Sequence, residues 1–202
     1  MTETVLKREA DLTPTSDKKG HEILICAPEW FDEKKKYKIS NAPARTASLE
    51  FTGKDLNFMA KVLFAEASGS MQLRDKAERD KEKAAIMNVN HFRLNRPEYP
   101  KASYIAKTFE RVCMAPGQFE SVFAETAKYV QVTTDHQKLN KFDCADLEEA
   151  LEAIRVFLNT GPTAEYQFDG FRGYNPKGPG THIGRSRFFL SDTGRRLMRE
   201  TP

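Results

Sequence analysis

Cysteine, histidine and the residue patterns that bind metals are scarce in this chain of 202 residues. Its three cysteines, Cys26, Cys113 and Cys144, are odd in number and widely separated. From this spacing we expect no disulfide framework, and we expect the chain to be synthesised in a reducing compartment. The four histidines are scattered, and the sequence contains neither a CxxC pair nor an HExxH run. We therefore expect no metal site and no cofactor.

The chain also lacks long apolar runs and a large charge of one sign. No stretch approaches the ~18–20 apolar residues that span a bilayer, so we expect no membrane span. The first residues have no apolar signal-peptide core, which predicts synthesis in the cytoplasm without a secretory signal. The net charge of +3, from 32 basic and 29 acidic residues, argues against a nucleic-acid partner, because such proteins cluster their positive charge.

What is present is enough apolar sequence for a core, since 39% of the residues are hydrophobic and 14 are phenylalanine. Residues 1–50 combine charged and Pro/Thr-rich pieces with one short apolar run at 23–27, which we expect to be a strand or a docking segment. We therefore predict a partly ordered N-terminal extension over 1–50 and one domain over 51–202.

Helical spacing of apolar residues begins after Thr52, which is placed to cap a helix with Asp55 three residues later. We expect this helix to end at 68–70, with Gly69 as a left-handed C-cap. A polar stretch over 74–83 then leads into a second predicted helix at 84–92, and a short helix is predicted over 104–112.

The clearest predicted helix covers 143–160, with Asp143 as its cap and Gly161 at its end. The glycine-rich residues 168–187 predict an irregular loop, and a short strand is expected at 187–190. The predicted fold class is therefore mainly α with a small β element.

Glu66 carries the clearest chemical signal. On a helical wheel it lies beside Met59, Val62 and Leu63, at the border of the apolar stripe, where partial desolvation raises the pKa of a carboxyl group. The partial negative charge at the C-terminal end of a helix acts in the same direction. A protonated acid near neutral pH can protonate a glycosidic oxygen. However, a glutamate at a stripe edge is more often a surface residue or an ion-pair partner, and the helix alone does not decide.

Three further elements follow the Ala-Glu-Ala sequence around Glu66. They are AAIMNVNHFRLNR at 84–96, VCMAPGQFE at 112–120, and FRGYNP at 171–176 followed by IGRSRFF at 183–189. Their order and character resemble the spore cortex-lytic family of bacterial cell-wall hydrolases. The resemblance covers roughly residues 55–190, and it implies a lysozyme-like (α+β) fold.

The resemblance also implies cleavage of peptidoglycan between N-acetylmuramic acid and N-acetylglucosamine, commonly as a lytic transglycosylase, with Glu66 as the catalytic acid. In that chemistry the acid protonates the leaving oxygen. The sugar's own 6-hydroxyl then attacks the anomeric carbon, with the ionised carboxylate as base, and a 1,6-anhydro end forms. No second carboxylate is needed, whereas a hydrolysing muramidase usually needs one.

Four residues in the matching motifs are candidates for substrate binding, each with an open structural explanation beside it: Gln118 (turn), Phe119 (core), Tyr174 (sugar stacking or a hydrogen bond to Glu66, against a plain loop position) and Asn175 (loop cap). Glu120 and Asp169 are candidates for a second carboxylate, which would favour a hydrolysing muramidase. A non-catalytic wall-binding module is the third interpretation.

The chain departs from the family at 70–83, which is longer and more charged than the usual link, and in the missing secretory signal. A wall hydrolase made without such a signal needs another route to the wall. An effector of a contact-dependent system such as type VI secretion, delivered to the periplasm of a target cell, fits this, and so does a phage lysis protein. Peptidoglycan is the expected partner in either case, and for an effector we also expect an immunity protein that inhibits the enzyme and a secretion carrier.

Overall fold

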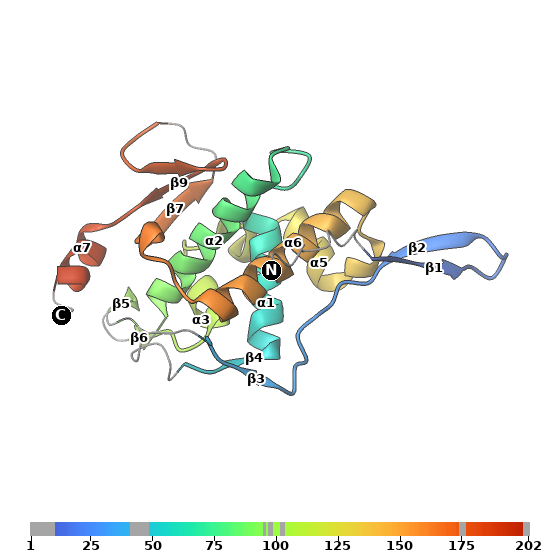
Figure 1. The fold of residues 1–202 in the computed structure, drawn as a ribbon, viewed down its shortest axis with the longest axis horizontal. Helices are drawn as coiled ribbons and strands as arrows, with labels where there is room; N and C mark the ends of the chain where they lie inside the picture. The colour runs from blue at the N-terminus through green and yellow to red at the C-terminus, as the bar shows by residue number, and fades with distance from the viewer. Residues whose placement is uncertain are drawn as a thin grey trace, which may run out of the picture.

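The computed structural model describes residues 11–40, 49–94, 96, 99–101, 104–173 and 177–199. They form an α+β fold in which helices predominate (Figure 1). The α-helices are α1 (Gly53–Glu66), α2 (Lys76–Arg93), α3 (Phe109–Cys113), α4 (Glu120–Phe123), α5 (Ala127–Thr134), α6 (Lys141–Thr160) and α7 (Asp192–Arg199). Two 3₁₀ turns are η1 (His136–Lys138) and η2 (Ala164–Tyr166).

The strands are short and pair antiparallel into small sheets. They are β1 (Leu12–Ser16), β2 (Glu22–Cys26), β3 (Lys36–Tyr37), β4 (Phe51–Thr52), β5 (Pro100–Lys101), β6 (Tyr104–Ile105), β7 (Gly170–Gly173), β8 (Thr181–Ile183) and β9 (Ser186–Phe189). Within the described ranges, no helix has the length and apolar composition needed to cross a bilayer.

Helix α1 lies at the centre of the helical region and packs against α2, α3, α5 and α6 (Figure 1). Its predicted apolar stripe is confirmed, because Leu56, Met59 and Leu63 are fully buried. Thr52 caps the helix as expected and accepts a hydrogen bond from the Asp55 backbone N–H at 3.1 Å. The Asp55 carboxylate does not reach back to complete a capping box. It accepts the backbone N–H groups of Phe109 and Glu110 and so anchors α3 against the start of α1.

The prediction for the end of α1 was wrong. The helix ends at Glu66, and Ala67 caps it in an extended conformation with φ −78° and ψ 158°. Gly69 is not in the left-handed region. A Cβ at Gly69 would instead overlap the Asp146 carboxylate, so this glycine is explained by the close approach of α6.

The second helix begins earlier than predicted, because the polar stretch before residue 84 is itself helical. Asp75 caps α2 and accepts the Ala77 and Glu78 backbone N–H groups. The first turns carry Arg79 and Lys83 on their inner face, where both are buried against α6. Charged residues occupy positions at which the apolar pattern would require hydrophobic ones, so the periodicity did not reveal the helix.

Helix α6 matches its prediction except at its start, since Asn140 caps it by accepting the backbone N–H groups of Phe142 and Asp143. Asp143 therefore lies inside the helix. Gly161 ends the helix with φ 72°, as a C-terminal glycine should. The helix predicted over 104–112 forms only as α3, and residues 104 and 105 form β6 instead.

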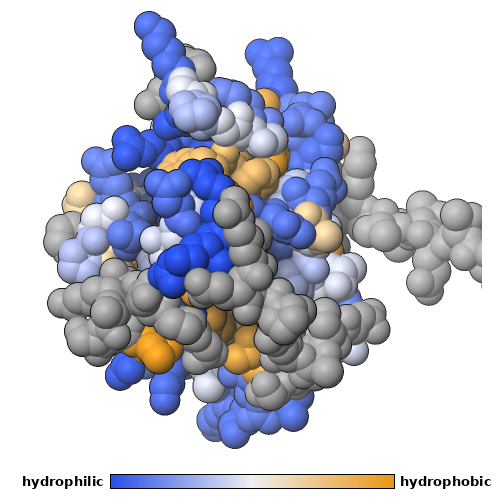
Figure 2. All heavy atoms as spheres, turned by 90° about the vertical axis from the view of Figure 1, so that its left-hand side faces the viewer, coloured by the Kyte–Doolittle hydropathy of each residue, from blue (hydrophilic) through white to orange (hydrophobic). Residues whose placement is uncertain are grey.

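The glycine-rich C-terminal segment contains more strand than predicted. Strand β9 lies where a strand was expected, but it is the centre of a three-stranded sheet with β7 and β8 on either side. The sheet and α7 form one end of the molecule (Figure 1). The face seen from that end is mainly hydrophilic, with small hydrophobic patches between the polar residues (Figure 2).

The N-terminal residues contain a β1–β2 hairpin that projects from the helices (Figure 1). Its second strand is the apolar run noted in the sequence. A disulfide joins Cys26 at the end of this strand to Cys144 in α6, which corrects the expectation that the cysteines form no disulfide framework. Cys113 remains a buried free thiol. Count and spacing could not reveal a bridge whose two cysteines are 118 residues apart in sequence.

Candidate active site

Glu66 is the last residue of α1, and its side chain is largely buried. One carboxylate oxygen, Oε1, accepts two hydrogen bonds from Ser121, in the first turn of α4. The backbone N–H donates at 3.1 Å, and the hydroxyl donates a second hydrogen bond to the same oxygen. Two bonds from one residue to the same oxygen fix the position of the carboxyl group.

Burial is the main cause of a raised pKa at Glu66, because the ionised form loses hydration. The two Ser121 hydrogen bonds oppose this effect by stabilising the carboxylate, and the negative charge of Glu120 adds to it. The net direction is upward, as the sequence predicted. The sequence predicted partial burial as a cause of this raised pKa, and the structure agrees. The opposing effect of Ser121 was not predicted.

The Glu66 carboxyl group opens on a cavity of about 450 Å³. One wall comes from the 117–120 turn and the other from strand β7. The lining residues are Glu66, Gly117, Gln118, Glu120, Phe171, Arg172 and Gly173. The fold therefore brings Gln118 and Glu120 together with Glu66, although they lie more than 50 residues away in sequence. Tyr174 and Asn175 directly follow β7 in the sequence, but both lie outside the described residues.

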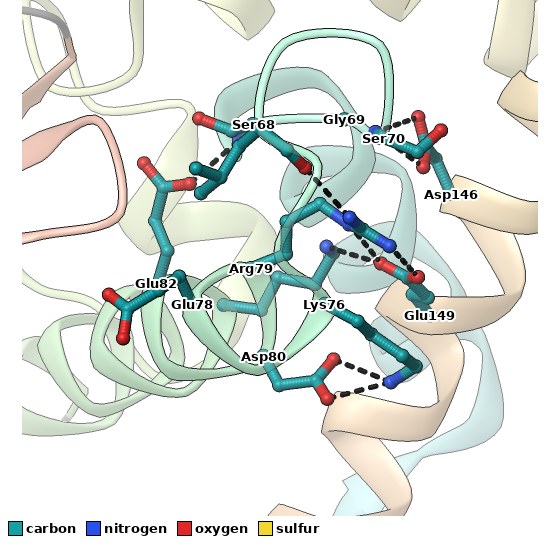
Figure 3. Close-up of polar contacts among 12 residues, drawn as sticks. Ser68, Gly69, Ser70, Lys76, Glu78, Arg79, Asp80, Glu82, Asp146 and Glu149 are labelled. Atoms are coloured by element: carbon teal, nitrogen blue, oxygen red, sulfur yellow. Dashed lines mark hydrogen bonds and ion pairs between the residues drawn. The ribbon is translucent and has the colours of Figure 1, made fainter.

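The buried carboxylate of Glu82 links the end of α1 to the sheet. It accepts hydrogen bonds from the Ser68 backbone N–H at 2.9 Å, from the Arg185 backbone N–H at 3.3 Å and from the Ser186 hydroxyl at 2.6 Å. Figure 3 shows Glu82 on α2 facing Ser68. Gly184, with φ 60°, permits this approach, since a Cβ there would overlap the Glu82 side chain. Glu82 therefore helps to fix the segment after Glu66 relative to the sheet that contains β7.

A second group of buried charges holds the same loop from the side of α6 (Figure 3). Asp146 accepts the Ser70 backbone N–H at 2.9 Å. Glu149 pairs with Arg79 at 2.6 Å and with Lys83 at 3.1 Å. Burial alone would raise the pKa of Glu149, but its hydrogen bond to Arg79 and the charge of Lys83 outweigh burial and lower it. The loop after Glu66 is thus fixed between α2 and α6.

Two predicted site residues do not belong to the cavity. Phe119 has no exposed surface and packs against Phe171, with ring centroids 5.6 Å apart, and against the Arg93 guanidinium. Its placement among the sugar-binding residues is corrected, because a fully buried ring cannot stack on a ligand. Its ring packs against Phe171 in β7 and so supports the strand that lines the cavity.

Asp169 is also engaged elsewhere. It is buried, pairs with Arg96 at 3.0 Å, and accepts the backbone N–H of Ser191 at 2.6 Å and the Ser191 hydroxyl. Burial would raise the pKa of Asp169, but the Ser191 bonds and the Arg96 charge lower it. Asp169 therefore fixes the start of α7 to the sheet. Its role as a second carboxylate is withdrawn, which leaves Glu120.

Sequence reasoning missed Ser121, Glu82 and Arg172. Arg172 lies in the FRGYNP motif at 171–176, but nothing in the sequence indicates that its side chain lines the cavity. Ser121 follows Glu120 directly, without a pattern that links it to Glu66. Glu82 lies in a run of charged residues, and nothing in the sequence distinguishes it from an exposed residue such as Lys81.

Within the described ranges, no group of three histidine, cysteine, aspartate or glutamate side chains is placed to hold a metal ion. Comparison of the chain with protein-family models, with curated proteins and with solved structures finds no match. The fold and the site therefore define the class of protein only coarsely, as an α+β protein with a desolvated carboxylic acid at a polar cavity.

Proposed function

We propose that this protein cleaves the glycan strands of peptidoglycan at the bond between N-acetylmuramic acid and N-acetylglucosamine, with Glu66 as acid and then base. The observation that supports this most is the raised pKa of a carboxyl group that opens on a cavity of about 450 Å³. A site of this size is in the range that holds small ligands such as sugar units. The helical (α+β) architecture is compatible with the lysozyme-like fold that the motifs imply.

In the proposed reaction, the protonated Glu66 gives its proton to the leaving oxygen as the glycosidic bond breaks. The 6-hydroxyl of the muramic acid then attacks the anomeric carbon and returns a proton to Glu66, so that no water is consumed. Ser121 stabilises the carboxylate that exists between these two steps, and it holds Oε1 in place throughout. Gln118 lines the cavity, and in this proposal its side-chain amide hydrogen-bonds an N-acetyl group of the substrate.

The second candidate function is a hydrolysing muramidase, and the position of Glu120 supports it. Glu120 lines the same cavity as Glu66, and its charge is near enough to raise the pKa of Glu66. An ionised Glu120 would activate a water molecule or stabilise positive charge at the anomeric carbon. The third candidate is a wall-binding module without catalysis, in which Glu66 has only a structural role.

We further propose that the protein acts outside the reducing cytoplasm, on the wall of a target cell as an antibacterial effector or at host lysis as a phage protein. The disulfide between Cys26 and Cys144 supports this, since such bonds persist in oxidising compartments such as the periplasm. As an effector, the protein would require an inhibitor that protects the producing cell and a secretion carrier.

The test is mass spectrometry of purified peptidoglycan digested with the wild-type protein, with Glu66→Gln and with Glu120→Gln. We expect 1,6-anhydro-muropeptides from the wild type and from Glu120→Gln, and at least a 10²-fold loss of product with Glu66→Gln. Reducing ends that disappear in both variants would support the hydrolysing muramidase. If the wild type cleaves no glycan from any wall type, the enzymatic proposal is wrong.

A further inference from the structure

Positive charge is concentrated in the C-terminal sheet and α7. Residues 170–199 contain seven arginine and lysine residues but a single acidic residue, Asp192. The whole chain has a net charge of only +3, so the rest of it is net acidic. Such a separation of charge creates a local field that attracts anions to one end of a nearly neutral protein.

Three of these basic residues line a groove at the sheet, which we call the arginine groove. It has a volume of about 520 Å³, and its lining includes Arg172, Arg187, Arg195, Phe189 and Gly180. Arg172 also lines the Glu66 cavity, so it borders both hollows. A molecule bound at Glu66 can therefore extend past Arg172 into the arginine groove.

Three basic side chains form a row across this face. In the antiparallel register Arg172 lies opposite Arg187, and Arg187 lies opposite His182, so all three project from the same side of the sheet. Like charges directly opposite each other destabilise a sheet. In the part of the chain that the structure describes, no carboxylate pairs with Arg172 or Arg187. A bound anion would relieve this repulsion.

The loop before β8 holds the Arg187 guanidinium in a fixed position. Arg187 donates a hydrogen bond from Nη1 to the Pro179 carbonyl at 3.3 Å. Gly178 and Gly180 have φ of 111° and 143°, and a Cβ at either position would overlap Arg187 or the β9 backbone. The Arg187 Nε atom is buried and has no hydrogen-bond partner among the described residues. The loop thus orients this side chain but leaves donors unused.

We propose that the arginine groove binds a carboxylate of the peptide stems that peptidoglycan carries on its muramic acid residues. A guanidinium is a planar fork of N–H donors that matches a carboxylate in a two-point contact. Arg172 borders both the groove and the cavity in which the muramic acid would lie, so a peptide stem on that sugar can reach the groove past Arg172. This inference rests on the proposed function, because it takes the substrate of the Glu66 cavity as the source of the anion.

Binding is tested in the Glu66→Gln background, in which substrate is not consumed. The probes are peptidoglycan strands stripped of teichoic acid, and the same strands after an amidase has removed the stems. Arg187→Gln should weaken binding to stem-bearing strands about tenfold, the value of one lost charged hydrogen bond, and leave binding to stem-free strands unchanged. Arg195→Gln should also weaken binding to stem-bearing strands. This second variant tests the groove independently if Arg187→Gln does not fold.

The matched control is Arg111→Gln, which removes the same charge from an exposed position on α3 and should not change binding to either probe. In the active protein, Arg187→Gln should raise KM on stem-bearing strands and leave kcat unchanged. This separates a binding residue from a residue that merely supports the fold.

The proposal is overturned if neither Arg187→Gln nor Arg195→Gln weakens binding, or if both weaken binding to stem-free strands equally. Arginine-dependent binding that is stronger for teichoic acid would assign the groove to phosphate instead. Arginine-dependent binding to duplex DNA alone would assign it to nucleic acid. A wild type that cleaves no glycan but shows the expected stem-dependent binding would refute the enzymatic proposal and leave the groove standing.

Discussion

Removal of the Ser121 hydroxyl tests how the Glu66 acid is tuned. In Ser121→Ala the backbone N–H still donates to Oε1 at 3.1 Å, but the hydroxyl hydrogen bond is lost. That bond stabilises the ionised form of Glu66. Its removal therefore raises the pKa of Glu66 further above the ordinary value. Because the protonated acid starts the proposed reaction, the enzyme should stay active to a higher pH.

The size of the shift follows from the strength of one hydrogen bond to a charged group, about 1.5–3 kcal/mol. Glu66 keeps some contact with solvent, so the lower end of this range applies, and it corresponds to about one pKa unit. The maximal rate should fall at the same time, because a carboxyl group held by one bond spends less time in the reactive position.

The assay is the pH profile of kcat/KM for glycan cleavage, together with a carbon-13 NMR titration of the Glu66 carboxyl group. The alkaline limb and the NMR midpoint should both move up by about one unit. Ser186→Ala is the matched control, since it removes a buried hydroxyl that donates to Glu82 rather than to Glu66. An unchanged midpoint in Ser121→Ala, or a midpoint that moves down, would refute the tuning argument.

Two further predictions concern stability. Reduction of the Cys26–Cys144 disulfide opens a loop of 118 residues. On the chain-entropy argument this should lower the free energy of unfolding by about 4–5 kcal/mol, which corresponds to a fall in Tm of about 10 °C. Equal melting curves with and without reductant would contradict this prediction. His91 is partly buried beside Phe157, and this burial lowers its pKa from 6.5 to about 4. The unfolded chain therefore binds a proton first as pH falls, so that stability is lost between about pH 6.5 and 4, by about 2 kcal/mol at pH 5. Urea titrations at pH 7 and pH 5 should show a smaller loss in His91→Gln, and an equal loss in both proteins would exclude His91 as the cause.

The parts of the fold that could be predicted are those in which one face of a helix is apolar and each end carries a local signal. Helix α1 has its stripe and its Thr52 cap, and α6 has its stripe and Gly161. In both helices the information lies within a few residues of the element that it specifies. The burial of Glu66 could be predicted for the same reason, since it follows from the position of the residue on α1.

The parts that could not be predicted depend on contacts between distant segments. The first turns of α2 bury Arg79 and Lys83, which are stable there because Glu149 lies opposite on α6. Without knowledge of that partner, two charged residues are expected to be exposed to solvent. The C-terminal sheet was hidden because its glycines, which suggest a loop, permit close approach to Glu82 and Arg187.

The same reasoning explains why the sequence could suggest the acid but not its strength. The upward effect on the pKa of Glu66 comes from burial. The position of Glu66 beside the apolar stripe of α1 predicts this burial from the local sequence. The downward effect comes from Ser121, 55 residues away, and the additional upward effect from Glu120 depends on the same turn. The pKa is the balance of these effects, so the position of α4 relative to the end of α1 sets it. A mutation that shifts α4 should therefore change the pH range of activity even if it touches neither Glu66 nor the substrate.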